Sequence, residues 1–232
     1  TLAAETYATY SSVKELDKQL TATKKAMEKA AKLPFSSDAT ERNIVLLGGN
    51  VNGLPGFILS KQADTNGRPV CFAFTGNPND TDGTNTFLSE DLLKKSINYQ
   101  LLEEGLVYPM FYETLYKELR DVMTKATVAA RLGNKGIWPS DVSNKGFTVK
   151  PPVNLKELPP IFPKLWRRLE AFYNRPSNKN KPVKDFVDFL SQGNDRLFTI
   201  PDQRAIKFST ALEVDGNKLK LKYKPEEMIF RP

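Results

Sequence analysis

Two groups of basic residues in this sequence have the types and spacing to bind phosphate. In the first group, Lys164, Arg167 and Arg168 surround Trp166 in a segment with helical periodicity. Arg can pair with a phosphate through two parallel hydrogen bonds, whereas Lys acts as a point charge. This helix is therefore a candidate nucleic-acid-binding element, and a solvated helix face is the alternative interpretation.

The second group is a row of lysines that alternate with apolar residues. The lysines are Lys218, Lys220, Lys222 and Lys224, and the residues between them are Leu219, Leu221 and Tyr223. A period of two places all four amines on one face of a strand. Such a row could follow a phosphate backbone. It could equally protect an edge strand, because lysines commonly discourage pairing with other chains. The sequence leaves both interpretations open.

The titratable composition excludes several kinds of catalysis. The chain of 232 residues contains no His, so Ser-His and Cys-His hydrolases, His-metal sites and His general bases are excluded. The single cysteine, Cys71, lies among Val70, Phe72 and Phe74 and is expected to fill a core. Any catalysis must therefore depend on carboxylates, Arg, Lys, Tyr or a hard metal ion.

The net charge of +7 is carried by the second part of the chain. Residues 1–140 contain 16 Lys and Arg and 16 Asp and Glu, whereas residues 141–232 contain 18 and 11. A basic module favours an anionic partner such as nucleic acid or an acidic protein surface. A basic surface that serves solubility is the alternative. No apolar run approaches the ~20 residues of a membrane span, so no membrane partner is expected.

Hydrophobic periodicity and turn residues predict a mixed α+β protein. Helices are expected at residues 12–32, 90–104, 115–133, 163–174 and 182–191. Strands are expected at residues 44–47, 57–59, 70–74, 196–200, 205–214 and 218–224. We expect a first domain over residues 1–140, a proline-rich linker over residues 141–162, and a basic helical and β-hairpin extension over residues 163–232.

Three blocks in a fixed order resemble the C-terminal half of a staphylococcal-nuclease-like domain. They run from Gly67 to Phe74, from Ser96 to Pro109, and from Ala129 to Trp138. The resemblance lies in the Gly-Arg that opens the first block, the Ile-Asn and Gly-Leu that bracket the first helix, and the final Gly-Ile-Trp. Two later blocks, at residues 162–169 and 195–198, resemble the C-terminal extension of bacterial proteins of this type.

This resemblance implies an OB-type β-barrel, partial or complete, with packed helices. Such barrels bind oligonucleotides on one face. Family members that cleave DNA or RNA hold a calcium ion with carboxylates, activate water with a glutamate and stabilise the phosphate with two arginines. The resemblance places Glu5 at the position of the water-activating glutamate, and it makes Ca2+ the expected cofactor.

The sequence departs from the family pattern at the catalytic positions. The helix arginine of the family falls at Glu103, and the Asp-Gly-Asp metal segment has no counterpart in the sequence. Arg68, Arg120 and Arg131 are candidates for a substitute phosphate clamp. Two functional hypotheses follow. Either a companion polypeptide supplies the missing barrel strands of a phosphodiester-cleaving nuclease, or the chain is a catalytically inactive scaffold that binds nucleic acid or serves an assembly.

Overall fold

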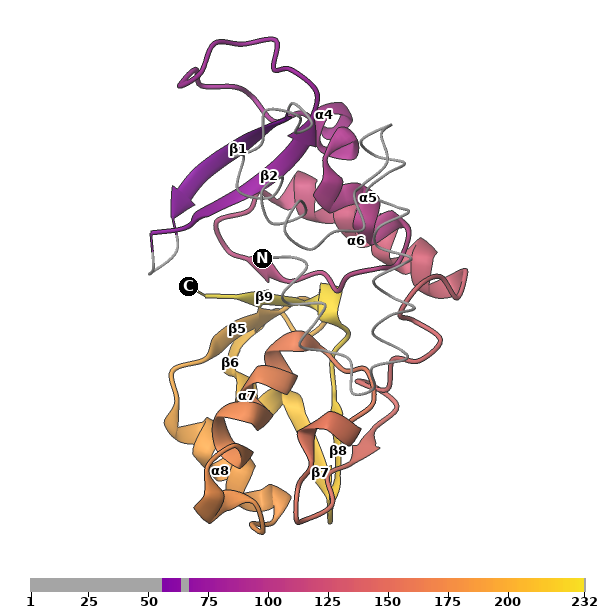
Figure 1. Ribbon diagram of the computed structural model, residues 1–232, viewed down its shortest axis with the longest axis vertical. Helices are drawn as coiled ribbons and strands as arrows, with labels where there is room; N and C mark the ends of the chain where they lie inside the picture. The colour runs from indigo at the N-terminus through magenta and orange to yellow at the C-terminus, as the bar shows by residue number, and fades with distance from the viewer. Residues whose placement is uncertain (1–55, 64–66, 232) are drawn as a thin grey trace, which may run out of the picture.

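The structure is a computed structural model that describes residues 56–63 and 67–231. Within these ranges the protein is mixed α+β, with five α-helices and three sheets (Figure 1). The predicted helix at 12–32, the predicted strand at 44–47 and the candidate catalytic residue Glu5 lie outside the described residues.

The first part of the described chain packs three helices beside a β-hairpin. Strands β1 (Gly56–Ala63) and β2 (Pro69–Thr75) contain the strands predicted at 57–59 and 70–74, and they pair in antiparallel fashion. Helices α4 (Glu90–Lys95), α5 (Ile97–Glu103) and α6 (Lys117–Leu132) follow, with α5 packed against both β2 and α6. The apolar faces of these helices form a core whose buried members include Leu93, Leu101, Leu102, Leu119 and Val122.

The single helix predicted at 90–104 is divided in two by Ser96. This residue has an extended backbone (φ −68°, ψ 147°), and its side chain is fully buried. Its hydroxyl donates to the Leu93 carbonyl at 2.6 Å and accepts from the Tyr99 amide at 3.1 Å. Serine therefore ends one helix and caps the next, because its side chain replaces backbone hydrogen bonds that a continuous helix would make.

Asn98 of α5 ties the helix to the hairpin. Its Oδ1 accepts a hydrogen bond from the Ala73 amide at 2.9 Å, and its Nδ2 donates to the Cys71 carbonyl at 3.4 Å. Both backbone groups belong to β2. The side chain thus takes the place of a neighbouring strand, and it satisfies polar groups that a sheet edge would otherwise expose.

The second part of the described chain surrounds a larger core with helices and short strands. Helices α7 (Pro163–Tyr173) and α8 (Val183–Gln192) match the predicted ranges closely. Residues 141–162, predicted as a proline-rich linker, contain β4 (Phe147–Thr148) and the 3-10 helix η1 (Leu155–Glu157). They also contribute buried side chains to this core, which are Phe147, Val149, Val153, Leu158, Ile161 and Phe162.

The strand predicted at 205–214 is interrupted. Strand β6 (Arg204–Lys207) is followed by the 3-10 helix η3 (Phe208–Ala211), and only then by β7 (Leu212–Asp215). The interruption has a physical reason, because Phe208 and Ala211 are both buried in the core. A strand would point the first inward and the second outward.

The remaining strands join the two parts. Strand β5 (Arg196–Thr199) pairs with β6 and with β9 (Met228–Phe230), and β9 pairs in parallel with β3 (Phe111–Tyr112). The resulting four-stranded sheet has the order β3-β9-β5-β6. In Figure 1 this sheet lies between the β1–β2 hairpin and the body that contains α7 and α8. Strand β9 was not predicted from the sequence.

A third sheet has the order β4-β8-β7, with β8 spanning Lys218–Leu221. The turn between β7 and β8 contains Gly216 at positive φ, a conformation that glycine adopts easily in a tight hairpin. Among the described residues the three sheets contain two, four and three strands, and none closes into a barrel. The coarse α+β class is therefore confirmed, whereas the OB-type barrel is not confirmed.

Candidate nucleic-acid interface

The basic residues of α7 mostly contact an acidic side chain of the same protein. Lys164 Nζ lies 3.1 Å from Asp195 Oδ1 and 4.7 Å from the centre of the Phe230 ring, and the lysine side chain is only 12% exposed. Arg168 holds the same carboxylate with Nε on Oδ2 and with Nη2 at 2.7 Å from Oδ1. Two of the three predicted phosphate ligands on this helix therefore stabilise the fold by fixing the start of β5.

The pKa shifts in this cluster agree with its geometry. Burial lowers the pKa of Lys164, although the charge of Asp195 opposes the shift. Burial acts to raise the pKa of Asp195, but the Arg168 hydrogen bond and the charge of Lys164 outweigh it and hold this pKa below its ordinary value. Asp195 is thus a carboxylate at neutral pH, and it keeps its two cations from an external anion.

Arg167 and Trp166 do not complete an exposed phosphate site on α7. Arg167 Nη2 lies 3.8 Å from the Met110 sulfur, and Trp166 packs partly buried against the larger core. The helix therefore presents no open row of cations around an aromatic ring. The alternative interpretation, a solvated helix face, does not fit either, because Lys164 and Asp195 are largely buried.

The lysine row shows the predicted alternation, and β8 lies in the centre of its sheet. Leu219, Leu221 and Tyr223 are buried, whereas Lys218, Lys222 and Lys224 are exposed and Lys220 is half-buried. The interpretation of β8 as a protected edge strand is therefore wrong, because β8 has β4 on one side and β7 on the other, and Lys222 and Lys224 lie beyond its end.

Part of this row is neutralised by the neighbouring strand. Lys218 stands opposite Asp215 and Lys220 opposite Glu213, and Lys220 Nζ lies 3.1 Å from the Glu213 carboxylate. Cross-strand pairs of opposite charge stabilise a sheet modestly. The first half of the row therefore serves the β7–β8 hairpin, and the excess positive charge begins beyond the end of β8.

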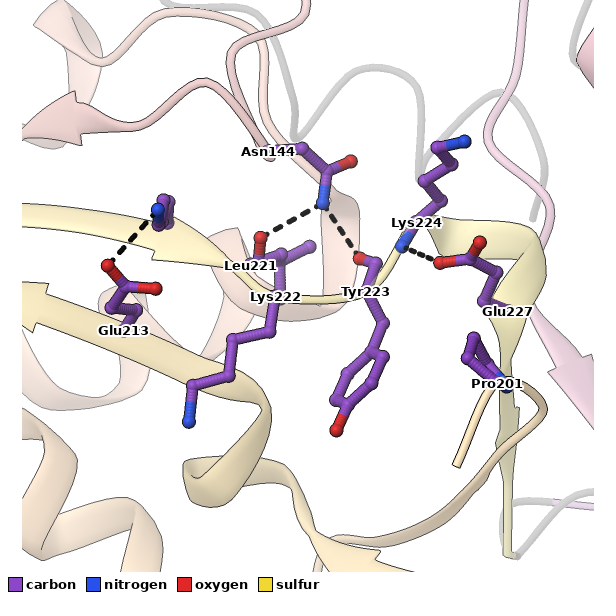
Figure 2. A pocket seen from close by; sticks show the side chains of 9 residues that line it. Asn144, Pro201, Glu213, Leu221, Lys222, Tyr223, Lys224 and Glu227 are labelled. Carbon is purple, nitrogen blue, oxygen red and sulfur yellow. Dashed lines mark hydrogen bonds and ion pairs between the residues drawn. The ribbon is translucent and has the colours of Figure 1, made fainter. Parts of the chain in front are cut away.

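That excess charge borders an open pocket of about 520 Å³. Figure 2 shows the pocket and its lining. The lining residues are Asn144, Pro201, Glu213, Lys220, Leu221, Lys222, Tyr223, Lys224 and Glu227. Asn144 Nδ2 donates to the Leu221 carbonyl at 3.0 Å and to the Tyr223 carbonyl at 2.8 Å, so it fixes the backbone of this segment.

The two acidic residues of the pocket are already engaged. Glu213 pairs with Lys220, and Glu227 accepts a hydrogen bond from the Lys224 backbone amide at 2.8 Å. Lys222 Nζ donates to the Thr210 carbonyl at 2.8 Å and forms no ion pair with another described residue. Lys224 points away from the Tyr223 ring and from Lys222 in Figure 2. Its ammonium likewise has no acidic partner within the described ranges.

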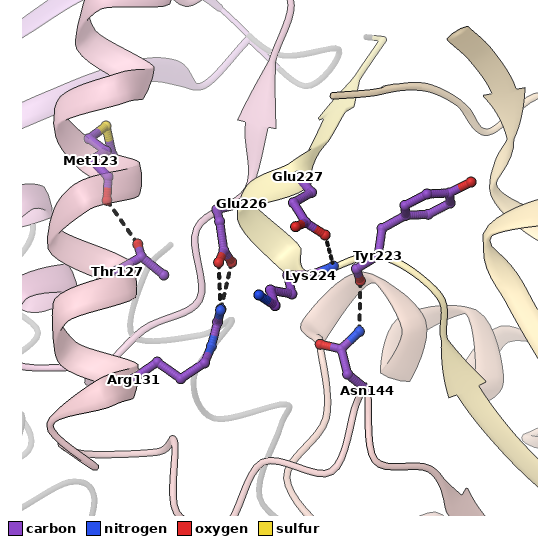
Figure 3. Close-up of polar contacts among 8 residues, drawn as sticks. All are labelled: Met123, Thr127, Arg131, Asn144, Tyr223, Lys224, Glu226 and Glu227. Carbon is purple, nitrogen blue, oxygen red and sulfur yellow. Dashed lines mark hydrogen bonds and ion pairs between the residues drawn. The ribbon is translucent and has the colours of Figure 1, made fainter. Parts of the chain in front are cut away.

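A buried ion pair beside this segment was not identified from the sequence. Arg131 of α6 donates from both terminal nitrogens to the Glu226 carboxylate, at 2.5 Å each (Figure 3). Glu226 belongs to the 3-10 helix η4 (Pro225–Glu227) and its side chain is 3% exposed. Arg131 also stacks over the Trp138 ring at 4.4 Å. The sequence offers no signal that would pair residues 131 and 226.

Two of the candidate substitute clamps make contacts within the protein. Arg131 is committed to Glu226, and Arg120 donates to the Leu115 carbonyl. Glu103, where the family pattern has an arginine, lies exposed at the end of α5, and its backbone carbonyl accepts from Lys135 Nζ at 3.1 Å.

A metal centre is not seen in the part of the chain that the structure describes. Over residues 56–63 and 67–231, no group of three or more His, Cys, Asp and Glu side chains is placed to hold a metal ion. Glu5 lies outside these ranges. Calcium binding and the catalytic role of Glu5 therefore stay predictions.

Comparison with known proteins finds no family model, no curated protein and no solved structure that matches this chain. The resemblance to staphylococcal-nuclease-like domains consequently stays a prediction. None of the described helices has the length and apolar character to cross a membrane.

Proposed function

We propose that this protein is a scaffold that binds the phosphate backbone of nucleic acid at the pocket beyond β8. The observation that carries this proposal is the exposure of Lys222 and Lys224 at the rim of an open pocket whose acidic residues are already engaged. This geometry favours the hypothesis of a binding scaffold, because two exposed lysines, Lys222 and Lys224, lie beside the pocket.

The form of the pocket supports a backbone ligand. A volume of about 520 Å³ falls within the range that accommodates a small ligand or one nucleotide unit. Tyr223 is only 9% exposed, so its ring offers little face for base stacking. Binding would therefore depend on phosphate contacts and show little sequence preference.

Removing the two rim cations tests the proposal. We expect Lys222→Gln with Lys224→Gln to weaken binding of a labelled single-stranded oligonucleotide and to reduce the slope of log affinity against log salt by about 1.5. Fluorescence anisotropy between about 50 and 200 mM salt measures both quantities. DNA and RNA strands of equal sequence show whether the sugar matters.

A matched control separates the pocket from net charge. Lys94→Gln with Lys95→Gln removes the same charge from α4, where both lysines are exposed. We expect this variant to bind almost as the wild type does. Proteins that bind the phosphate backbone have higher affinity at lower salt concentration. Absence of wild-type binding at about 50 mM salt would therefore contradict the proposed function.

We also propose, as hypotheses to be tested separately, membership of the staphylococcal-nuclease-like family, an OB-type barrel and phosphodiester cleavage. Their support is the order of the β1–β2 hairpin, α5 and α6, and the return of Ile137 and Trp138 to a buried position. A nuclease would need Glu5, calcium and the companion polypeptide that supplies further strands. Calcium-dependent cleavage of the same oligonucleotides, abolished by Glu5→Gln, would establish that activity.

A further inference from the structure

The loop between α7 and α8, together with the first turn of α8, carries a dense group of cations that the sequence did not single out. Residues 174–184 contain four basic residues and no acidic residue. The four are Arg175, Lys179, Lys181 and Lys184, and all are exposed. In Figure 1 α7 and α8 lie at the end of the molecule away from the β1–β2 hairpin.

A second segment adds its cations to this loop. The Val153 amide donates to the Lys179 carbonyl at 2.9 Å, so the backbone at Val153 lies beside the loop. Lys150 and Lys156 flank Val153, and both are exposed. We name the six residues the basic platform, which consists of Lys150, Lys156, Arg175, Lys179, Lys181 and Lys184.

The platform rests on a fixed backbone. Asn178 is 7% exposed, and its Nδ2 donates to the Phe172 carbonyl at 3.0 Å. The Asn178 amide donates to the Arg175 carbonyl, and the Lys181 amide donates to the Asn178 carbonyl, each at 2.9 Å. The backbone that carries the loop cations is therefore fixed before any ligand arrives, which reduces the backbone entropy lost on binding.

The platform keeps its positive charge. None of its six members forms an ion pair with another residue of the described ranges, in contrast to Lys164, Arg168 and Lys220. Two of them lie over aromatic rings: Lys181 is 5.9 Å from the centre of Phe172, and Arg175 is 5.7 Å from that of Phe189. Such contacts position the charged group near the ring and do not neutralise its charge.

Three acidic residues belong to the same region. Glu157 accepts a hydrogen bond from Asn154 at 2.7 Å, Asp185 lies in the first turn of α8, where the helix dipole stabilises its charge, and Asp188 stands one helical turn from Lys184. They offset three of the six cations. The remaining excess is larger than at the pocket, where three lysines face two carboxylates.

We propose that the basic platform is a second phosphate-contact surface for nucleic acid, an inference that rests on the proposed function. Its lack of exposed large apolar side chains favours this ligand. The exposed large hydrophobic residues of the described chain all lie elsewhere, in residues 58–132 and 198–214. Protein interfaces and membrane-binding surfaces normally include such residues.

The composition of the platform indicates how it binds. Five of its six cations are lysines, which act as point charges and do not form the planar double hydrogen bonds of arginine. Lysines on a surface without base-stacking rings contact phosphates of any sequence. The platform therefore adds affinity and salt dependence, and it adds no base specificity.

The test neutralises three lysines of the platform in the full chain. We expect Lys179→Gln, Lys181→Gln and Lys184→Gln together to weaken oligonucleotide binding by about ten- to a hundredfold at low salt, and to reduce the salt slope by about 2. The matched control is Lys94→Gln, Lys95→Gln and Lys125→Gln, which removes the same charge from exposed positions on α4 and α6. Circular dichroism and thermal unfolding check that both variants keep the fold.

The outcomes distinguish the two proposals. If the wild type binds and the platform variant keeps its affinity and salt slope, the platform is overturned while the proposed function stands. An equal loss in the α4 and α6 control would also overturn it, because the effect would then be one of net charge. If the wild type binds no oligonucleotide but binds poly-glutamate or phosphatidylserine vesicles, both proposals fail and the partner is of another class.

Discussion

Asp195 changes how the basic residues of α7 are interpreted, because it pairs with two of them inside the protein. The sequence presents Lys164 and Arg168 as phosphate ligands, and the structure places an internal anion between them. The pair could not be foreseen, because 27 residues separate Arg168 from Asp195 and no pattern links them. A charged side chain can pair with another side chain or with a ligand, and sequence alone does not separate the two cases.

Replacing Asp195 with Asn should destabilise the protein by about 2–4 kcal/mol at neutral pH, because it leaves the largely buried Lys164 without its counter-ion. Urea unfolding at neutral pH measures the loss. The variant Asp91→Asn is the control, since its pair with Lys94 is long and exposed, and a change near zero is expected.

The same variant gives a pH prediction. The folded-state pKa of Asp195 lies below the ordinary value of 3.8. The contribution of Asp195 to folding stability is therefore complete above that ordinary value, and it is lost as pH falls through the folded-state pKa. The stability difference between wild type and Asp195→Asn should therefore stay constant from neutral pH to about 5 and narrow below about 4. A difference that is independent of pH would contradict the assigned role.

At the scale of elements, the sequence predicts most helices and few of the strand pairings. Helices α6, α7 and α8 lie within about two residues of their predicted ranges, because their apolar periodicity and terminal glycine or proline are local signals. Strand β9 was missed, since three consecutive buried residues show no alternation. The partners of a strand are long-range information, so the central position of β8 could not be predicted.

Two glycines at positive φ differ in the space around them. The first, Gly136, lies where the chain that follows α6 meets the end of α5. Gly136 has φ +53°, and a β-carbon there would lie 2.1 Å from the Gly105 carbonyl oxygen. Gly216 has a similar φ of +57°, but open space surrounds it. The two sites therefore share the backbone strain and differ in the steric clash.

We expect Gly216→Ala to cost about 1 kcal/mol and Gly136→Ala to cost about 3 kcal/mol or more. Chemical denaturation followed by circular dichroism measures both changes. Equal losses in the two variants would show that the chain near Gly136 moves aside easily, against the close backbone contact in the structure.

At the scale of the whole molecule, the two parts are joined by the β3–β9 pair and by the Arg131–Glu226 ion pair. The ion pair is bidentate and the Glu226 carboxylate is buried, so both carboxylate oxygens depend on the planar guanidinium of Arg131. These contacts predict that the parts unfold together.

Arg131→Lys tests this coupling, because lysine keeps the charge but cannot make two parallel hydrogen bonds. We expect a loss of about 1–3 kcal/mol in the free energy of unfolding, with a change in tryptophan fluorescence, to which Trp138 and Trp166 both contribute, and one shared unfolding transition. Lys117→Gln, which breaks an exposed pair with Asp121, should cost about 0.5 kcal/mol or less. Two separate transitions in the wild type would contradict the coupling.

The parallel pairing of β3 with β9 has a consequence for synthesis on the ribosome. Phe111 and Ile229 stand opposite each other in this pair and share one core, so the helices of the first part emerge long before that core is complete. At about 5–20 residues per second, the nascent chain waits on the order of ten seconds for its closing strand. During that interval the apolar faces of α5 and α6 are open to chaperones, and we expect a chain stalled before Met228 to be a chaperone substrate.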